Sequence, residues 1–160
     1  MPDAVRVQQA AFAFGAEAEA FATRVDGAGA VVTFAGIVRD ADTGGLERME
    51  IEHYPGMTER ALQQIRDQAM ARWSLADAMI LHRHGALRPG ETIMMVATAA
   101  RHRADAFAAA EFLMDYLKSR APFWKKEIAS GVASWVDARD ADEAALERWR
   151  RKDAAPGKTG

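Results

Sequence analysis

The stretch that decides the fold runs from residue 76 to residue 100 and reads ADAMILHRHGALRPGETIMMVATAA. Two mostly apolar runs, Ala76–His84 and Thr92–Ala100, flank the sequence Arg88-Pro89-Gly90-Glu91. Such runs, bounded by Gly and Pro, are typical of β-strands, and the Pro-Gly pair favours a turn. We therefore expect two strands joined by a hairpin-like turn. An antiparallel pair of this kind favours an α+β protein over a parallel doubly wound sheet.

The segments on either side alternate irregularly between strand and helix patterns. Ala30–Val38 (AVVTFAGIV) is β-branched and mostly apolar, which predicts a buried strand, and its internal Gly36 suggests a bulge. Thr58 is placed to cap a helix that ends near Trp73. Further strands are expected at Val5–Gln8, Leu46–Tyr54, Phe123–Ile128 and Val132–Val136, and further helices at Ala16–Arg24, Ala104–Ser119 and Asp142–Arg151. The buried stripe of the 104–119 helix is predicted to comprise Phe107, Ala110, Leu113, Met114 and Leu117.

Length and composition indicate one compact domain. The chain has 160 residues, of which 49% are hydrophobic and 28% charged, as in ordinary globular proteins. We expect a mixed or antiparallel sheet with helices packed on it over residues 1–150, and a disordered polar tail over residues 151–160. The near-neutral charge argues against broad nucleic-acid binding. The sequence shows no signal-peptide pattern and no apolar run near ~20 residues, so a cytoplasmic location is expected.

The chain contains no cysteine. This excludes disulfides, thiolate metal sites and any mechanism that uses a thiol of the chain itself. If the protein takes part in sulfur chemistry, another molecule must therefore carry the sulfur.

Cations gather between residues 101 and 126. This stretch holds six Lys or Arg and three Asp or Glu, a net charge of +3 in a chain whose formal charge is -2. Arg101, His102 and Arg103 precede a helix, where backbone amides and guanidinium groups can converge on an anion such as a phosphate. The alternative is that these side chains only extend into solvent. Lys118 and Arg120 lie at the other end of the helix, where the helix dipole favours cations in any case.

The segment after Pro122 carries two adjacent lysines. In an extended strand, Phe123 and Lys125 lie on one face and Trp124 and Lys126 on the other, so one lysine faces apolar surroundings. Desolvation and neighbouring cations both lower the pKa of a lysine, which would give a proton donor or nucleophile near neutral pH. The alternative is an ordinary lysine whose stem covers an aromatic ring.

Three other residues carry weaker signals. His82 and His84 are two residues apart on one expected strand, which is a spacing seen in metal sites. No third ligand stands nearby, so structural or solvent-facing roles are favoured for both histidines. Arg39 ends an apolar strand beside the 40–45 loop, where it could reach either water or a ligand.

Several segments together resemble the large, catalytic subunit of molybdopterin synthase. The resemblance covers roughly residues 29–150 in one continuous order. The matching runs are residues 29–39 (GAVVTFAGIVR), 46–58 with the core EHYPGM, 82–85 (HRHG), 88–91 (RPGE), 101–103 (RHR) and 114–127 (MDYLKSRAPFWKKE).

This resemblance implies an α/β-hammerhead-like fold and a sulfurtransferase of molybdenum cofactor biosynthesis. The substrate would be cyclic pyranopterin monophosphate, which receives two sulfurs to form the dithiolene of molybdopterin. The sulfur would arrive as a thiocarboxylate on the C-terminal Gly-Gly of a small ubiquitin-like partner, in agreement with the absence of cysteine here. The family further implies a central homodimer within a heterotetramer, and no metal or organic cofactor of its own.

The resemblance also assigns site residues. Lys118 matches the essential lysine, expected at the thiocarboxylate as acid, base or transient nucleophile, and Lys125 matches a second lysine that holds substrate or stabilises developing charge. The matching substrate-binding residues are Ile37, Val38, Arg39, His102, Arg103, Lys126 and Glu127. Arg139 matches an arginine that reaches the site of the neighbouring protomer. Ile37 stands where the family commonly has lysine.

Two other classes of function stay open at this point. A cationic pocket alone would suit a non-catalytic module that binds an anion or a nucleotide. A scaffold subunit could also retain the fold without the chemistry. The presence of both Lys118 and Lys125 favours the enzyme over either alternative.

Overall fold

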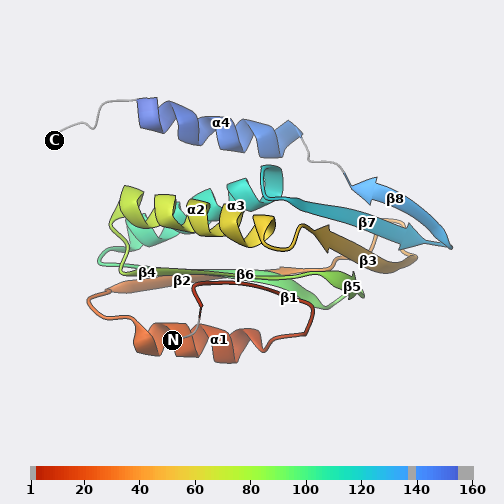
Figure 1. Cartoon of the computed structure of the whole chain (residues 1–160), viewed down its shortest axis with the longest axis horizontal. Coiled ribbons are helices and arrows are strands. Elements are labelled where there is room, and N and C mark those ends of the chain that lie inside the picture. Colours follow the sequence, from red (N-terminus) through yellow and green to blue (C-terminus); the bar gives the residue numbers. More distant parts are fainter. Residues whose placement is uncertain (1–2, 137–139, 155–160) are drawn as a thin grey trace.

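The computed structural model describes residues 3–136 and 140–154, which form two four-stranded sheets and four helices (Figure 1). The first sheet has the strand order β1 (Val5–Gln8), β4 (Asp77–Arg83), β6 (Thr92–Ala100) and β2 (Ala30–Ile37). Within it, β1 is parallel to β4 and the other pairs are antiparallel. The second sheet is antiparallel, in the order β5 (Gly85–Leu87), β3 (Leu46–His53), β7 (Phe123–Ala129) and β8 (Val132–Val136).

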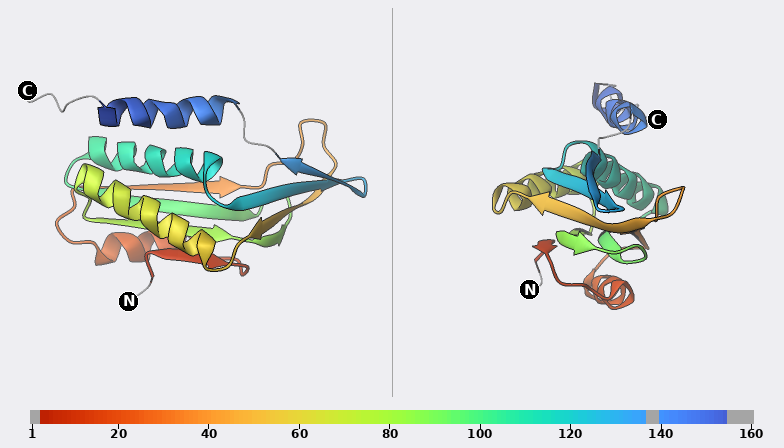
Figure 2. Two further views of the ribbon diagram at one scale, coloured as in Figure 1. Left: turned by 45° about the horizontal axis from the view of Figure 1, so that its top comes forward. Right: turned by 90° about the vertical axis from the view of Figure 1, so that its right-hand side faces the viewer.

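The helices cover the first sheet on both faces. The helix α1 (Phe14–Arg24) lies on one face, and α2 (Met57–Trp73) and α3 (Arg103–Ser119) lie side by side on the other. The helix α4 (Asp140–Ala154) packs outside α3, as both views in Figure 2 show. The predicted α+β class is therefore confirmed. The strands form two sheets, because the chain leaves the first sheet after β2 and again after β4. None of the described helices is long and apolar enough to cross a membrane.

The predicted hairpin-like connection carries a strand of its own. Strands β4 and β6 pair antiparallel, with Asp77 opposite Ala99. Between them, β5 leaves the first sheet and pairs with β3 in the second. Gly85, at the start of β5, has a φ of 91°, a conformation that glycine adopts at little steric cost. The connection thus completes one sheet and joins it to the other.

Strands β4 and β6 are continuous apolar runs because they lie between two apolar layers. One layer lies between the first sheet and the helices α2 and α3, and the other lies under α1. Strands that are covered on both faces need apolar side chains at successive positions rather than at alternate ones. The first layer includes Leu62, Ile65, Ile80, Val96 and Leu113, and the second includes Phe21, Met79, Leu81 and Met95.

Strand β2 differs from the prediction in its burial. Its register shifts between Gly36 and Ile37, which confirms the expected irregularity at Gly36. Val31, Phe34 and Ile37 are exposed by 38%, 43% and 58%. The expectation of a fully buried strand is therefore wrong. The physical reason is that β2 is the edge strand of its sheet, so side chains at that edge meet solvent.

The long helix α3 also differs in one predicted core residue. It begins at Arg103, and its buried residues include Ala106, Phe112 and Leu113, whereas Phe107 is 61% exposed. A turn of 3.6 residues places Phe107 beside the buried stripe rather than in it. The helix α1 begins two residues earlier than predicted, at Phe14. The helix α4 extends to Ala154, and the remainder of the predicted tail, residues 155–160, lies outside the described residues.

The predicted cap of α2 is wrong as well. The N-cap residue is Gly56, whose φ is 84°, and the carboxylate of Glu59 accepts a hydrogen bond from its amide. Thr58 is fully buried and uses its hydroxyl differently. That hydroxyl accepts from the Tyr54 amide at 2.9 Å and donates to the carbonyl oxygen of Pro122 at 3.1 Å. Thr58 therefore joins the start of α2 to the segment that leads into β7.

We expect Thr58→Val to lower the free energy of unfolding by about 1–3 kcal/mol, because the isosteric side chain leaves the Tyr54 amide and the Pro122 carbonyl without their partner. Thr58→Ser is the matched control, since it keeps the hydroxyl. Urea unfolding followed by circular dichroism measures both variants. Equal stability of Thr58→Val and the unmodified chain would contradict the assigned role.

Candidate active site

A small pocket lies where the C-terminal end of α3 meets the first sheet and β7. Its volume is about 80 Å³. The lining combines apolar side chains with three nitrogen-bearing ones, drawn from β2, β4, β6, α3 and β7: Phe34, Gly36, Ile37, His82, Ile93, Met94, Met114, Leu117, Lys118 and Lys125. The fold thus brings five elements, far apart in the sequence, to one place.

A larger cavity of about 310 Å³ lies between α2, α3 and α4 and is lined in part by Phe112, Tyr116 and Trp149. Two cations border it, Arg120 and Arg150, and each pairs with a glutamate of α4. Lys118 and Lys125, which line the smaller pocket, do not line this larger cavity. We take the smaller pocket as the candidate site because two amines meet there and, within residues 3–136 and 140–154, neither forms an ion pair with a carboxylate.

Lys125 is the most perturbed of the predicted residues. Burial, followed by the nearby positive charge of Lys118, lowers the pKa of Lys125 from its ordinary 10.5 to about 8, whereas Asp142 acts in the opposite direction. The alternation predicted for residues 123–126 is confirmed, because Phe123 and Lys125 share the inner face of β7. At neutral pH this amine is still mostly charged, but its neutral form is far more populated than that of an ordinary lysine, as a proton donor or a nucleophile requires.

Lys118 is the penultimate residue of α3, and the two residues that follow it are held by α4. The hydroxyl of Ser119 donates to the carbonyl oxygen of Asp142 at 3.0 Å, and Arg120 pairs with Glu143 at 2.6 Å. Lys118 itself is exposed and lines the pocket. Its side chain is thus free to move while the helix end that carries it is anchored.

His82 occupies the wall of the same pocket. It is 2% exposed, and its Nδ1 lies 2.7 Å from the carbonyl oxygen of Arg83. Its ring stacks on Phe123, with centroids 3.8 Å apart and planes inclined by 17°. Burial, followed by the charge of Lys125, lowers the pKa of His82 to about 3. His82 is therefore a neutral imidazole at physiological pH.

The two histidines of the predicted metal spacing do not share surroundings. His84 follows the end of β4, and its ring packs on that of His53, with centroids 4.2 Å apart. Among the described residues, no group of three or more His, Cys, Asp or Glu side chains could hold a metal ion. The structural interpretation of His82 and His84 thus agrees with their contacts.

The predicted residues at the end of β2 divide into different environments. Ile37 lines the pocket. Val38 is 2% exposed, and its backbone exchanges hydrogen bonds with Gly90 and Glu91, so its side chain belongs to the core. Arg39 follows at the surface. Anchoring of Val38 fixes where Arg39 leaves the sheet, next to the pocket wall formed by Ile37.

The residues after Lys125 face other neighbours. Lys126 lies on the outer face of β7, where its Nζ is 4.7 Å from the centroid of the Trp135 ring and 3.9 Å from Glu52. Glu127 pairs across the sheet with Met49. Neither residue lines the pocket. Arg139 lies outside the described residues.

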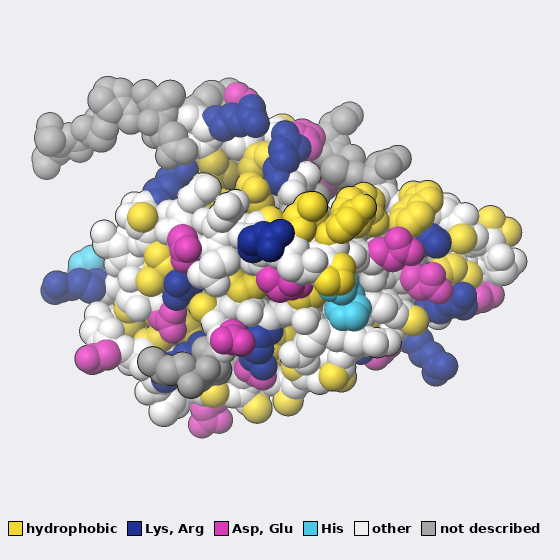
Figure 3. All heavy atoms as spheres, viewed as in Figure 1, with side chains coloured by type: hydrophobic (Ala, Val, Ile, Leu, Met, Phe, Trp, Pro, Cys, Tyr) yellow, Lys and Arg dark blue, Asp and Glu magenta, His cyan; other side chains and the backbone are white. Residues whose placement is uncertain are grey.

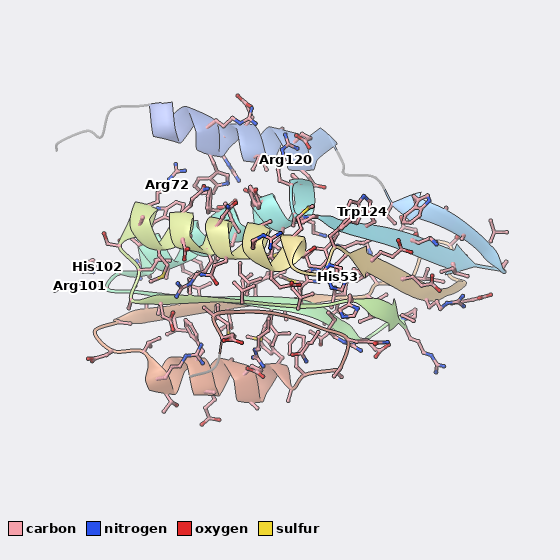
Figure 4. The ribbon with its side chains drawn as sticks, viewed as in Figure 1. His53, Arg72, Arg101, His102, Arg120 and Trp124 are labelled. Carbon is pink, nitrogen blue, oxygen red and sulfur yellow. The ribbon has the colours of Figure 1, made fainter. Side chains whose placement is uncertain are left out.

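His102 and Arg103 do not lie in this pocket. They stand at the N-terminal end of α3, whereas Lys118 is near its C-terminal end, about 22 Å away at 1.5 Å per residue. Figure 4 shows Arg101 and His102 at one end of the molecule and Arg120 and Trp124 toward the other. The cations of residues 101–126 therefore do not share one pocket of a single chain, because a helix keeps its two ends apart.

Sequence analysis missed several residues of the pocket. Phe34 and Met114 line it, and both lie inside segments that were predicted only as strand and helix. His82 was weighed only as a metal ligand or a structural residue. The sequence did carry a signal for His82, because this histidine follows the apolar residues 78–81. A polar group buried among such residues needs a partner, which would have indicated a polar pocket there.

Comparisons with known proteins identify the family of this chain. A family model described as MoaE protein matches residues 7–120. A relative from Cereibacter sphaeroides, named molybdopterin synthase catalytic subunit, is 68% identical over 91% of this chain and 99% of its own length. The structure of molybdopterin cofactor biosynthesis protein E from Burkholderia multivorans superposes with a TM-score of 0.77 at 52% identity, covering 91% of this chain and 95% of that one.

A more distant structure shares the fold. It is a complex of subunits 1 and 2 of molybdopterin-converting factor from Helicobacter pylori, with a TM-score of 0.69 at 19% identity, covering 86% of this chain and 92% of that one. At this identity the likeness concerns the fold alone.

We expect Lys125→Met to raise the free energy of unfolding at pH 7 by roughly 2–3 kcal/mol, because the folded chain disfavours the ammonium form that the unfolded chain retains. Between about pH 8 and pH 10.5 the unfolded state of the unmodified chain binds more protons, so its stability rises with pH and the advantage of the variant disappears. Lys126→Met is the control and should preserve the pH slope. Denaturant unfolding at several pH values measures all three proteins, and a gain independent of pH would contradict the assignment.

Proposed function

The chain belongs to the MoaE protein family, and from this premise we propose that it is the catalytic subunit of a molybdopterin synthase. In this proposal it transfers sulfur from the thiocarboxylated C-terminus of a small ubiquitin-like subunit to cyclic pyranopterin monophosphate, which forms the dithiolene of molybdopterin. The single observation that carries the proposal is the meeting of Lys118 and Lys125 in one pocket, with the pKa of Lys125 lowered to about 8.

The two amines suit different parts of such a reaction. A thiocarboxylate is an anion, and an ammonium group in a partly desolvated pocket stabilises it more strongly than in water. Lys125 is buried and can supply that charge or return a proton as sulfur leaves its carrier. Lys118 is exposed on a flexible stem, so it can reach the reacting carbonyl as acid, base or transient nucleophile.

The size of the pocket supports a narrow ligand. Its volume of about 80 Å³ is well below the ≈300–1,000 Å³ of sites that enclose a small molecule. A Gly-Gly terminus has no side chains and can enter such a pocket in extended form. The pterin would then lie at the mouth of the pocket, where Arg39 leaves the sheet.

An apolar surface beside the pocket suits the docking of the small subunit. Figure 3 shows hydrophobic side chains gathered at the end of the molecule that carries β3, β7 and β8. Tyr54 and Trp124 are 56% and 43% exposed there, and their rings meet edge to face, with centroids 5.4 Å apart. Trp124 adjoins Lys125 in β7, so a protein seated on this surface could direct its tail into the pocket.

His102 and Arg103 lie far from the pocket of their own chain, but a second copy of the chain could bring them to the pocket of its partner. Strand β2 begins near Arg101, since Gly29 donates to the Ala100 carbonyl oxygen, and it ends at Ile37 in the pocket wall. Exposed apolar residues follow this edge strand from Val31 to Ile37. Two copies packed along β2 in opposite directions about a two-fold axis would place Arg103 of each at the pocket of the other. This arrangement keeps the predicted substrate-binding role of both residues.

A non-catalytic anion-binding module is the second candidate. The exposed His102 and Arg103 alone would suffice for it. The buried lysine argues against this alternative, because a pKa lowered to about 8 suits an amine to proton transfer, which a module that only binds an anion does not need. The cytoplasmic location stays a prediction from the sequence.

We expect Lys118→Ala to abolish formation of the dithiolene product when cyclic pyranopterin monophosphate and the thiocarboxylated small subunit are supplied, because the exposed amine of the pocket is lost. Arg120→Ala removes a cation two residues away that pairs with Glu143 outside the pocket, and it should retain most of the activity because the Ser119 hydroxyl still holds the helix end to α4. Product is measured by chromatography after a fixed time. Near-normal turnover by Lys118→Ala would refute the assignment of this lysine.

The two-copy arrangement predicts complementation between inactive variants. Lys118→Ala and Arg103→Ala should each be impaired alone, the second mainly in substrate affinity. After unfolding and refolding together, half of the dimers are mixed, and each mixed dimer contains one intact site. Activity should therefore recover to about a quarter of the normal value, since a two-fold dimer has two equivalent sites. No recovery, with mixed dimers verified by mass spectrometry, would show that Arg103 does not act across the interface.

A further inference from the structure

The pocket holds one polar residue to which the proposed chemistry gives no role, the buried His82. We propose that His82 is a positioning residue that accepts a hydrogen bond at Nε2 from the ammonium group of Lys125. This inference rests on the proposed function for its consequence in sulfur transfer. The interaction itself can be tested without that reaction.

The contacts of His82 fix its tautomer. The carbonyl oxygen of Arg83 can only accept a hydrogen bond, so Nδ1, which lies 2.7 Å from it, must carry the proton. In a neutral imidazole the other nitrogen, Nε2, then bears a lone pair. Stacking on Phe123 at 3.8 Å holds the ring plane. The pocket is thus provided with a neutral acceptor in a fixed orientation.

Lys125 lacks an acceptor of its own. Among the residues that the structure describes, no hydrogen bond or ion pair joins its ammonium group to another side chain. A largely buried ammonium without a partner is costly, and a neutral acceptor in the same pocket reduces that cost without adding charge. An aspartate in place of His82 would instead hold Lys125 permanently charged.

The register of β7 places the two groups together. Phe123 and Lys125 lie on the same face of the strand, so the imidazole stacked on Phe123 lies beside the lysine stem. The stem is long and flexible, and Lys125 and His82 line the same small pocket. Lys118 also lines this pocket, and the charges of both lysines act on His82.

Other titratable groups also act on this pair. The charge of Lys118 lowers the pKa of Lys125, Asp142 raises it, and His53 acts weakly on His82. Of these, His82 is the one that can stabilise the ammonium form of Lys125 while itself uncharged. In sulfur transfer, it would hold the ammonium at the reacting centre.

Nuclear magnetic resonance of the full chain, with lysine labelled at the ε-position, tests the inference by following Lys125 from about pH 6 to pH 10.5. The Lys125 signal is assigned by its loss in Lys125→Arg. The matched variants are His82→Asn, which keeps a donor near Nδ1 but has no group at Nε2, and His82→Gln, which places an amide oxygen near Nε2. His84→Asn is the control, since His84 lies outside the pocket.

The midpoint of the Lys125 titration should fall by about half a pH unit or more in His82→Asn, because loss of the acceptor disfavours the charged form. It should stay close to that of the unmodified chain in His82→Gln and in His84→Asn. Equal midpoints in all four proteins would overturn the proposal, and so would equal shifts in His82→Asn and His82→Gln.

A second measurement on the unmodified chain guards against a variant that fails to fold. The ¹⁵N shift of His82 Nε2 reports hydrogen bonding at this nitrogen, so it should change with an inflection near the pH at which Lys125 titrates, about 8. A constant shift across that range would overturn the proposal. Because neither measurement requires turnover, failure of the sulfur-transfer assay would leave this result intact and distinguishable.

Discussion

The antiparallel pairing of β4 with β6 is the contact on which the rest of the structure depends. Both strands are buried on both faces, so helices must cover the sheet from either side. The end of β6 leads into α3, and the end of β4 leads through Gly85 into the second sheet. The pocket forms at the end of β4, where His82 and Met94 face each other across the pair and the C-terminal end of α3 packs over them.

The burial of Lys125 that suits the candidate site to chemistry also lowers the stability of the folded chain. Burying the amine of Lys125 beside that of Lys118 disfavours its charged form, and the surrounding structure must offset this cost. The offset comes from contacts that hold the same elements rigidly. Thr58 joins α2 to the segment before β7, and α4 anchors the helix end after Lys118. Perturbed amines held on a rigid frame are characteristic of catalytic sites.

Much of the fold could be predicted, because periodicity and turn chemistry are local. The alternation of Phe123 with Lys125, the irregularity at Gly36 and the turn before Glu91 all follow from neighbouring residues. The errors arose where distant elements compete. Threonine is a common helix-capping residue, but the hydroxyl of Thr58 donates a hydrogen bond to the carbonyl oxygen of Pro122 instead. Val31 and Phe34 look buried by composition, but their strand lies at the edge of the sheet.

For the site, the sequence by itself determined which residue types are present and which two lysines match a family motif. The absence of cysteine and the 114–127 run follow from composition and order alone. Only the tertiary structure decided which cations share a pocket. Residues 101–126 look like one cationic cluster along the chain, yet α3 separates Arg103 from Lys118, while β7 folds back to bring Lys125 beside Lys118 and His82. The physical reason is that proximity and desolvation arise from packing between segments distant in the sequence, and these two effects set the pKa of an amine.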